Sequence, residues 1–190
     1  MEPQEQKADS ILMSVLVAEE VNKVVVFKEK RTSVYFNNHE ILVDGLKQIY
    51  WSKRVLIKLL DQMIRMSSSE NLADILEEYQ VVTHRQSRRL EDIFSILSIS
   101  PAAKVCQPLK NIINDTSHEI YELPKGSKRD VEFISLTLQF QKYWTAKGEI
   151  LCEISEGLSE DGVKVLLEET QEECKLLDMN LAYLLERNMK

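Results

Sequence analysis

Apolar residues recur every three or four positions along most of this 190-residue chain. A stripe of this kind begins in "NNHEILVDGLKQIYWSKRVLIKLLDQMIRM" and predicts a long amphipathic helix, with Asn38 as its N-cap. Lys53 stands at the one stripe position that is not apolar, which is unexpected because this face should meet the core. The apolar members are Leu42, Leu46, Ile49, Leu56, Leu60 and Met63.

Three more long helices follow from the same spacing. Ser67 and Glu70 have the separation of a capping box and start the second helix, which runs to about residue 97. Another is expected at roughly 129–156, and the last follows "GLSEDG" and continues to the end of the chain. Their expected inward residues are Leu72, Leu76, Tyr79, Val82, Gln86, Leu90, Ile93 and Leu97; then Phe133, Thr137, Phe140, Trp144 and Leu151; then Val163, Leu166, Thr170, Cys174, Leu177, Leu181 and Leu184.

The remaining segments are shorter or less regular. Ser100 followed by Pro101 predicts the start of a short helix over roughly 101–121, and "LPKGSKRD" is expected to be a loop. Residues 10–37 are compatible with a helix or, through "VVVF", with a strand; a helix is favoured because a single strand would lack a partner. We therefore expect an N-terminal extension, 1–37, that is partly helical, followed by one domain over 38–190.

Four long helices, one short connecting helix and short loops predict an all-α fold, a four-helix bundle. The sequence contains no GxGxxG, no P-loop and no Ser-His-Asp grouping. We therefore predict no catalytic and no cofactor-binding residues, and a protein that is not an enzyme.

The net charge of −7 argues against nucleic acid or an anionic membrane as the main partner, because both require a basic surface. The basic cluster "HRQSRR" (residues 84–89) is interpreted as a solvated helix face. Three widely spaced cysteines without a CxxC pair indicate reduced thiols rather than a zinc site. No run is long enough for a membrane span, and an acidic segment precedes "ILMSVLVA", so no signal peptide is expected and the protein is predicted to be cytoplasmic.

Metal sites in helical bundles are built from inward carboxylates and histidines on facing helices. The inward positions nearest mid-bundle here are Lys53, Val82, Gln86, Gln141, Trp144 and Glu173. One carboxylate cannot hold a metal pair, and His39, His84 and His118 are interpreted as surface or capping residues. Lys53 either pairs with Glu173, with Gln86 and Gln141 supplying hydrogen bonds, or extends along its aliphatic stem to solvent.

Several motifs, in order over residues 40–187, resemble the YciE/YciF-like family of bacterial ferritin-like proteins. They are "ILVDGLKQIYWSKRVLIKLLDQM", "RRLEDIF", Cys106 before the short helix, Asp130 at the start of the fourth helix, and "EECKLLD". The resemblance implies a ferritin-like bundle that pairs as a homodimer, sometimes binds two metal ions, and is associated with stress responses.

The chain departs from this family at the metal ligands. The resemblance implies Glu where Lys53 stands, Glu and His where Val82 and Gln86 stand, and Glu-His-Tyr-Glu where "QKYW" (141–144) stands. Glu173 and Asp178 remain acidic. We therefore expect a degenerate di-iron site with no metal and no cofactor bound.

Three functions stay open. The first is a metal-free, non-enzymatic ferritin-like bundle that acts as a homodimer or interaction module. The second is a metal-binding protein or oxidoreductase with a relocated, carboxylate-poor site, which would use the acidic row of the last helix. The third is an oligomeric scaffold in which the N-terminal extension docks on a neighbour. The acidic row consists of Glu168, Glu169, Glu172, Glu173 and Asp178.

Overall fold

The structure is a computed structural model that describes residues 31–188, with the side chains of 31–37, 117–119, 121 and 187–188 left out. Most of the predicted N-terminal extension therefore lies outside the described residues. Every regular element in the described part is a helix, which confirms the all-α prediction. The helices are α2 (Arg31–Met66), α3 (Glu70–Ile96), α4 (Gln107–Glu122), α5 (Ser127–Gly157) and α6 (Asp161–Asn188).

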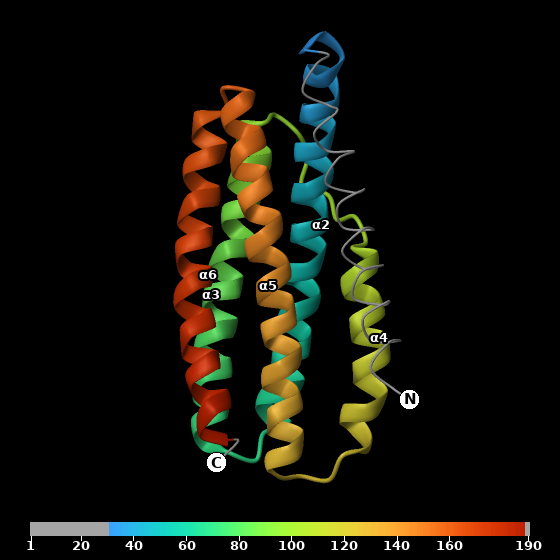
Figure 1. Cartoon of the computed structure of the whole chain (residues 1–190), viewed down its shortest axis with the longest axis vertical. Helices are drawn as coiled ribbons and strands as arrows, with labels where there is room; N and C mark the ends of the chain where they lie inside the picture. The colour runs from blue at the N-terminus through green and yellow to red at the C-terminus, as the bar shows by residue number, and fades with distance from the viewer. Residues whose placement is uncertain (1–30, 189–190) are drawn as a thin grey trace, which may run out of the picture. The chain divides into compact units, whose positions relative to one another are not determined.

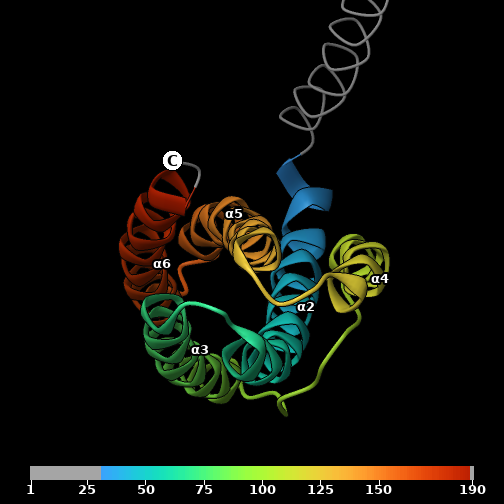
Figure 2. The same ribbon diagram turned by 90° about the horizontal axis from the view of Figure 1, so that it is seen from below.

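The four long helices form a bundle within the compact unit Glu40–Lys190. Viewed from the end, they follow one another around the core in the order α2, α3, α6 and α5, so that α2 faces α6 across a diagonal and α3 faces α5 (Figure 2). The short helix α4 lies outside this ring and carries the chain back along the bundle, so α3 and α5 run in the same direction (Figure 1). One long crossover between the second and third bundle helices is the connectivity of ferritin-like folds.

Two of the predicted helix starts are wrong. Helix α2 begins at Arg31, so Asn38 lies inside the helix and is not its N-cap. The N-cap of α3 is Ser69, whose hydroxyl accepts a hydrogen bond from the Leu72 backbone N–H. The Ser67 hydroxyl instead donates to the Met63 carbonyl at the end of α2. Three consecutive serines offer the same capping chemistry, so the capping-box spacing selected the wrong one.

The short helix also begins later than predicted, at Gln107 with Cys106 at the N-cap position. Residues 101–106 have no regular structure because they are attached to α2. The Lys104 backbone N–H donates to the Lys47 carbonyl, and the Lys104 ammonium pairs with Asp44. These contacts satisfy groups that a helical turn would otherwise use.

The α2–α3 turn is held by the first residues of α5. The buried Asp130 carboxylate accepts hydrogen bonds from the Ser68 and Ser69 backbone N–H groups, at 2.9 and 3.1 Å. Arg129 donates from Nη2 to the Met66 carbonyl at 2.6 Å. A carboxylate at a helix N-terminus and a guanidinium at a helix C-terminus both match the helix dipole, so this pair stabilises both helix ends. Gly126, at φ 155°, provides the backbone conformation that leads into α5.

The predicted core stripes agree closely with the buried faces. The first stripe is buried throughout, Lys53 included. Val82 is only half-buried and Thr83 takes the inward position; on α6, Leu167 and Gln171 are buried where Leu166 and Thr170 were expected. These one-residue shifts arise because a helix repeats every 3.6 residues, so adjacent positions compete for the inner face.

Candidate functional site

Lys53 lies at the centre of the bundle, and its side chain is fully buried. Its ammonium donates a hydrogen bond to Gln86 Oε1 on α3 at 2.6 Å. On the α5 side, Nζ lies 3.3 Å from the centroid of the Trp144 ring, in a cation–π contact. The hypothesis that Lys53 extends to solvent is therefore wrong.

Gln86 connects Lys53 to Glu173 on the diagonally opposite helix, so the predicted direct pair between the two charges is also wrong. The Gln86 amide nitrogen donates to Glu173 Oε2 at 3.1 Å and to the Cys174 sulfur at 3.8 Å. Because an ammonium only donates and a carboxylate only accepts, these neighbours determine the orientation of the amide. All of the hydrogen-bonding groups of the Gln86 side chain are used.

Two arginines of α3 hold Glu173. Arg89 makes a two-pronged contact, from Nη1 to Oε2 at 2.9 Å and from Nη2 to Oε1 at 3.0 Å, and Arg85 Nε lies 2.9 Å from Oε1. Partial burial alone would raise the Glu173 pKa, but the hydrogen bonds from Arg89 and Gln86 and the two guanidinium charges outweigh it and hold the pKa below its ordinary value. Glu173 is therefore an ionised carboxylate whose charge is balanced by the two guanidinium groups.

Burial lowers the pKa of the Lys53 ammonium from its ordinary value of 10.5 to about 8. Glu173 and Cys174 oppose this shift, while Arg89 adds to it. The main cause is the loss of water around the charge, which one amide oxygen and one indole face replace only in part.

A second set of buried polar contacts surrounds the lysine. The Tyr79 hydroxyl donates to Gln141 Oε1 at 2.5 Å, and the Gln141 amide donates to the Cys174 carbonyl. Trp144 Nε1 donates to Ser52 Oγ at 2.7 Å, which fixes the ring that covers Lys53. Gln141 thus supplies hydrogen bonds as expected, but to Tyr79 and α6 and not to Lys53.

These residues do not fit a pair of divalent metal ions. Such a pair requires several carboxylates to balance its charge, with oxygen or imidazole donors that converge on it. The centre instead holds one ammonium, two amides whose groups are engaged, and an indole. Its single carboxylate is already paired with two guanidinium groups. We therefore derive no chemistry through a metal at this position.

The acidic row of α6 is distributed over several ion pairs. Glu168 lies 3.8 Å from Lys164, Glu169 lies 3.2 Å from Arg89, and Asp178 lies 3.9 Å from Lys142. Glu172 is exposed. Among the residues that the structure describes, no group of three or more His, Cys, Asp or Glu could hold a metal ion. A relocated site on this row stays a prediction with no geometric support.

The three histidines are dispersed. His39 and His84 are exposed on α2 and α3, and His118 belongs to α4, where its side chain is not described. His84 lines an open groove between α2 and α3.

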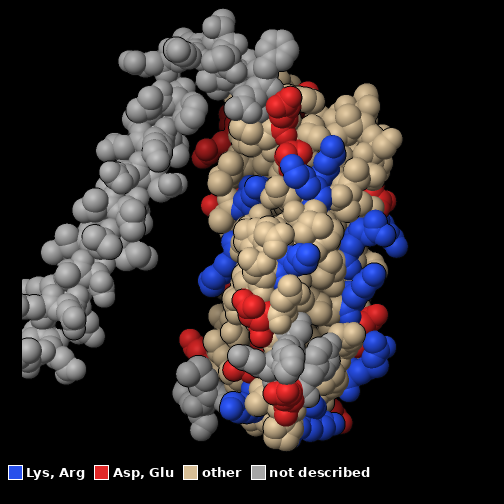
Figure 3. Space-filling view, turned by 90° about the vertical axis from the view of Figure 1, so that its right-hand side faces the viewer, with Lys and Arg blue, Asp and Glu red and all other residues tan. Residues whose placement is uncertain are grey.

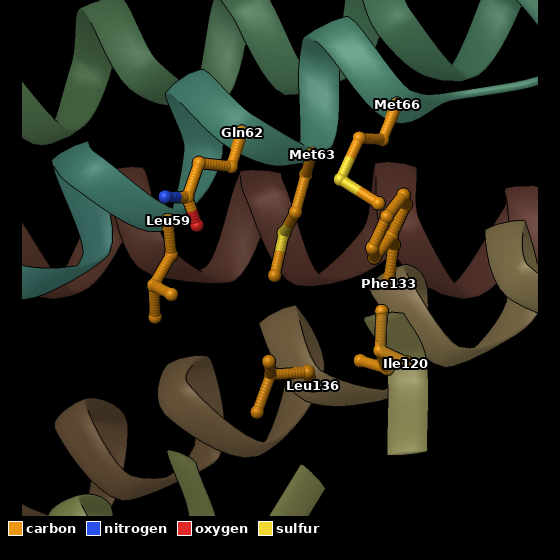
Figure 4. A pocket seen from close by; sticks show the side chains of 7 residues that line it. All are labelled: Leu59, Gln62, Met63, Met66, Ile120, Phe133 and Leu136. Carbon is orange, nitrogen blue, oxygen red and sulfur yellow. The ribbon is translucent and has the colours of Figure 1, made fainter. Parts of the chain in front are cut away.

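A small apolar cavity lies between α2, α4 and α5 (Figure 4). Its volume of about 20 Å³ is close to the room that one water molecule needs, and its walls are mainly aliphatic and aromatic. It is a packing gap beneath the short helix rather than a ligand site. Its lining residues are Leu59, Gln62, Met63, Met66, Ile120, Phe133 and Leu136.

The sequence interpretation missed Arg89 and Ser52. Arg89 was included in a solvated basic cluster, yet its side chain is only 12% exposed. Its place in the sequence could have indicated this, because it follows the inward Gln86 by three residues and so lies at the edge of the same helix face. Ser52 is fully buried one residue before Lys53 and gave no comparable signal.

A bundle of four long helices with one long crossover, and a polar cluster at its centre, defines the class of ferritin-like helical bundles. The chain belongs to the family described as Domain of unknown function (DUF892), whose model matches residues 37–190. The predicted resemblance to YciF-like proteins is thereby confirmed.

Solved structures share this fold. The E. coli stress protein YciF is 23% identical and superposes with a TM-score of 0.74, covering 80% of this chain and 96% of its own. YcfI from Rhodopseudomonas palustris is 22% identical, with a TM-score of 0.73, covering 76% of this chain and 92% of its own. No curated protein matches the sequence significantly. None of the described helices combines the length and apolar character that crossing a bilayer would require.

Proposed function

We propose that this chain is a metal-free, non-enzymatic member of its family that acts in the cytoplasm as a homodimer or protein-interaction module. The observation that carries the proposal is the buried Lys53 ammonium. It stands between Gln86 and Trp144 at the centre of the bundle, where the resemblance implies metal-binding carboxylates. An ammonium there repels a cation and provides no lone pair to bind one.

A role in stress responses is part of this proposal. Its support is the likeness of the fold to YciF, which is described as a stress protein. In the proposed role the bundle is a stable scaffold, held by apolar packing and by the hydrogen bonds around Lys53 rather than by metal ions.

We expect the purified, untagged protein to contain well below one metal ion per chain after incubation with iron(II), manganese(II) or zinc and removal of the excess. Elemental analysis measures this directly. The matched variant is Glu173→Gln, which removes the only central carboxylate; its metal content should equal that of the wild type. Stoichiometric metal in the wild type that falls in this variant would contradict the metal-free proposal.

For the homodimer, the support is an exposed apolar stripe on α6. Leu176, Met179 and Tyr183 are 65%, 69% and 58% exposed and lie one helical turn apart. Exposed apolar side chains in a row favour burial against another surface. Two copies of one helix can cover the same stripe about a two-fold axis.

We expect light scattering to give twice the mass of the chain for the wild type and the mass of one chain for Met179→Asp. Ile150→Asp, which replaces an exposed apolar residue of α5, is the control and should remain dimeric. A wild-type mass of one chain would contradict the homodimer, and leaves the metal result unaffected.

A further inference from the structure

An open groove of about 350 Å³ runs between α2 and α3, on the outside of the bundle and away from the Lys53 network. Arg54 and Lys58 of α2 line one wall, and His84 and Ser87 of α3 line the other. This volume lies within the range of small-molecule sites.

Some basic residues of the described chain have a carboxylate partner and others have none. Arg85, Arg89, Lys104, Lys142 and Lys164 each form an ion pair with a carboxylate. Within the described part of the chain, no such ion pair involves Arg54, Lys58 or His84. Arg54 and Lys58 therefore have no carboxylate partner among the described residues that a bound anion would have to displace.

Arg54 and Lys58 are also four residues apart on one helix, an arrangement that is unfavourable for two like charges. The Arg54 guanidinium lies over the Tyr50 ring, 5.6 Å from its centroid, which restricts its position. Figure 3 shows Lys and Arg side chains along the right-hand edge of the molecule, with Asp and Glu side chains between them. A bound anion would relieve the repulsion at this groove.

The floor and one end of the groove indicate the size of that anion. Ser87 is 8% exposed and offers a hydroxyl next to the cations. At one end, the Tyr50 hydroxyl donates to Glu91 Oε1 at 2.8 Å, which links the two walls and places a carboxylate there. A long polyanion that continued past Glu91 would meet a negative charge, so a compact anion fits better.

We propose that the groove binds a phosphate group, either free phosphate or a small phosphate monoester. Guanidinium, ammonium and hydroxyl donors together match the oxygens of a phosphate dianion. Arg54 and Lys58 provide charge from α2, and His84 and Ser87 complete the site from α3. This inference does not depend on the proposed metal-free role, because the two sites share no residue.

The test is calorimetric titration of the full chain with inorganic phosphate and, separately, with glycerol 3-phosphate. We expect saturable binding of at least one of them. The double variant Arg54→Gln/Lys58→Gln should raise Kd by at least about tenfold, because it removes two charge-assisted contacts. Tighter binding of phosphate would identify the free anion as the ligand, and tighter binding of glycerol 3-phosphate would identify a monoester.

The control is Lys110→Gln/Lys128→Gln, which removes the same charge from exposed positions on α4 and α5. It should leave Kd unchanged. Two results would overturn the proposal: no saturable binding of either compound, or an equal loss of affinity in the control, which would show a general charge effect. Unfolding curves of both double variants verify that they remain folded.

Discussion

Replacing Gln86 by Leu is expected to lower the free energy of unfolding by about 2–3 kcal/mol, because a buried charged group loses its hydrogen bond. The new side chain has a similar size, so packing changes little. However, the Lys53 ammonium would lose its 2.6 Å hydrogen bond and keep only the Trp144 face. Urea unfolding followed by circular dichroism measures the loss.

The same loss should largely disappear when Lys53 is replaced as well. In Lys53→Met/Gln86→Leu, an apolar pair fills the space and no unpaired charge remains. Replacing a buried charged group and its partner by apolar residues is often neutral or stabilising. We therefore expect the double variant to unfold within about 1 kcal/mol of the wild type, a strongly non-additive result for two neighbouring residues.

Gln80→Leu is the matched control because it makes the same substitution on the same helix. Its amide contacts Asp61 and the Ile57 carbonyl, away from the central lysine. It should cost about 1 kcal/mol, the typical net value of a hydrogen bond, and Lys53→Met should not change this cost. If Gln86→Leu were no more destabilising than Gln80→Leu, Gln86 would not be the group that supports the buried charge.

The helices and most of the core could be predicted because one physical signal determines both. A 3.6-residue apolar period marks the buried face of each long helix, and Leu42, Leu46, Phe140, Trp144 and Leu181 are all buried as expected. The predicted start of the short helix was wrong because contacts between distant segments, rather than the apolar period, determine the structure there. Residues 101–106 are attached to α2 through the hydrogen bond from the Lys104 backbone N–H to the Lys47 carbonyl, a contact between segments far apart in the sequence.

Three members of the central site were predicted, but their connections were not. Lys53, Gln86 and Glu173 were all identified as inward positions. Their order of contact depends on which helices are neighbours around the ring, and a helical period contains no such information. Helices α2 and α6 lie on a diagonal, and Gln86 on the intervening α3 links Lys53 to Glu173 (Figure 2).

Lys53 is expected to contribute stability that rises with pH between about 8 and 10. The ammonium has a pKa of about 8 in the folded protein and an ordinary value of 10.5 when the chain is unfolded. Between these values the unfolded chain binds more protons than the folded one, so folding becomes more favourable as pH increases. Below pH 8 both states are charged, and the full penalty of burying the charge is present.

Several groups act in the opposite direction, Tyr79 and Cys152 among them. Burial raises the pKa of the Tyr79 phenol well above its ordinary value, and it raises that of the Cys152 thiol to about 11. Both groups keep their protons longer in the folded state, which reduces stability as pH increases through the alkaline range. The contribution of Lys53 must therefore be measured as a difference between variants.

The measurement is the free energy of unfolding of the wild type minus that of Lys53→Met, determined at pH 7 and at pH 10. The difference should increase by about 2 kcal/mol in favour of the wild type, since Tyr79 and Cys152 are common to both proteins. Lys58→Met replaces an exposed lysine of the same helix and should show no such increase. A flat difference between wild type and Lys53→Met would mean that Lys53 keeps an ordinary pKa, because its surroundings solvate the ammonium as well as water does.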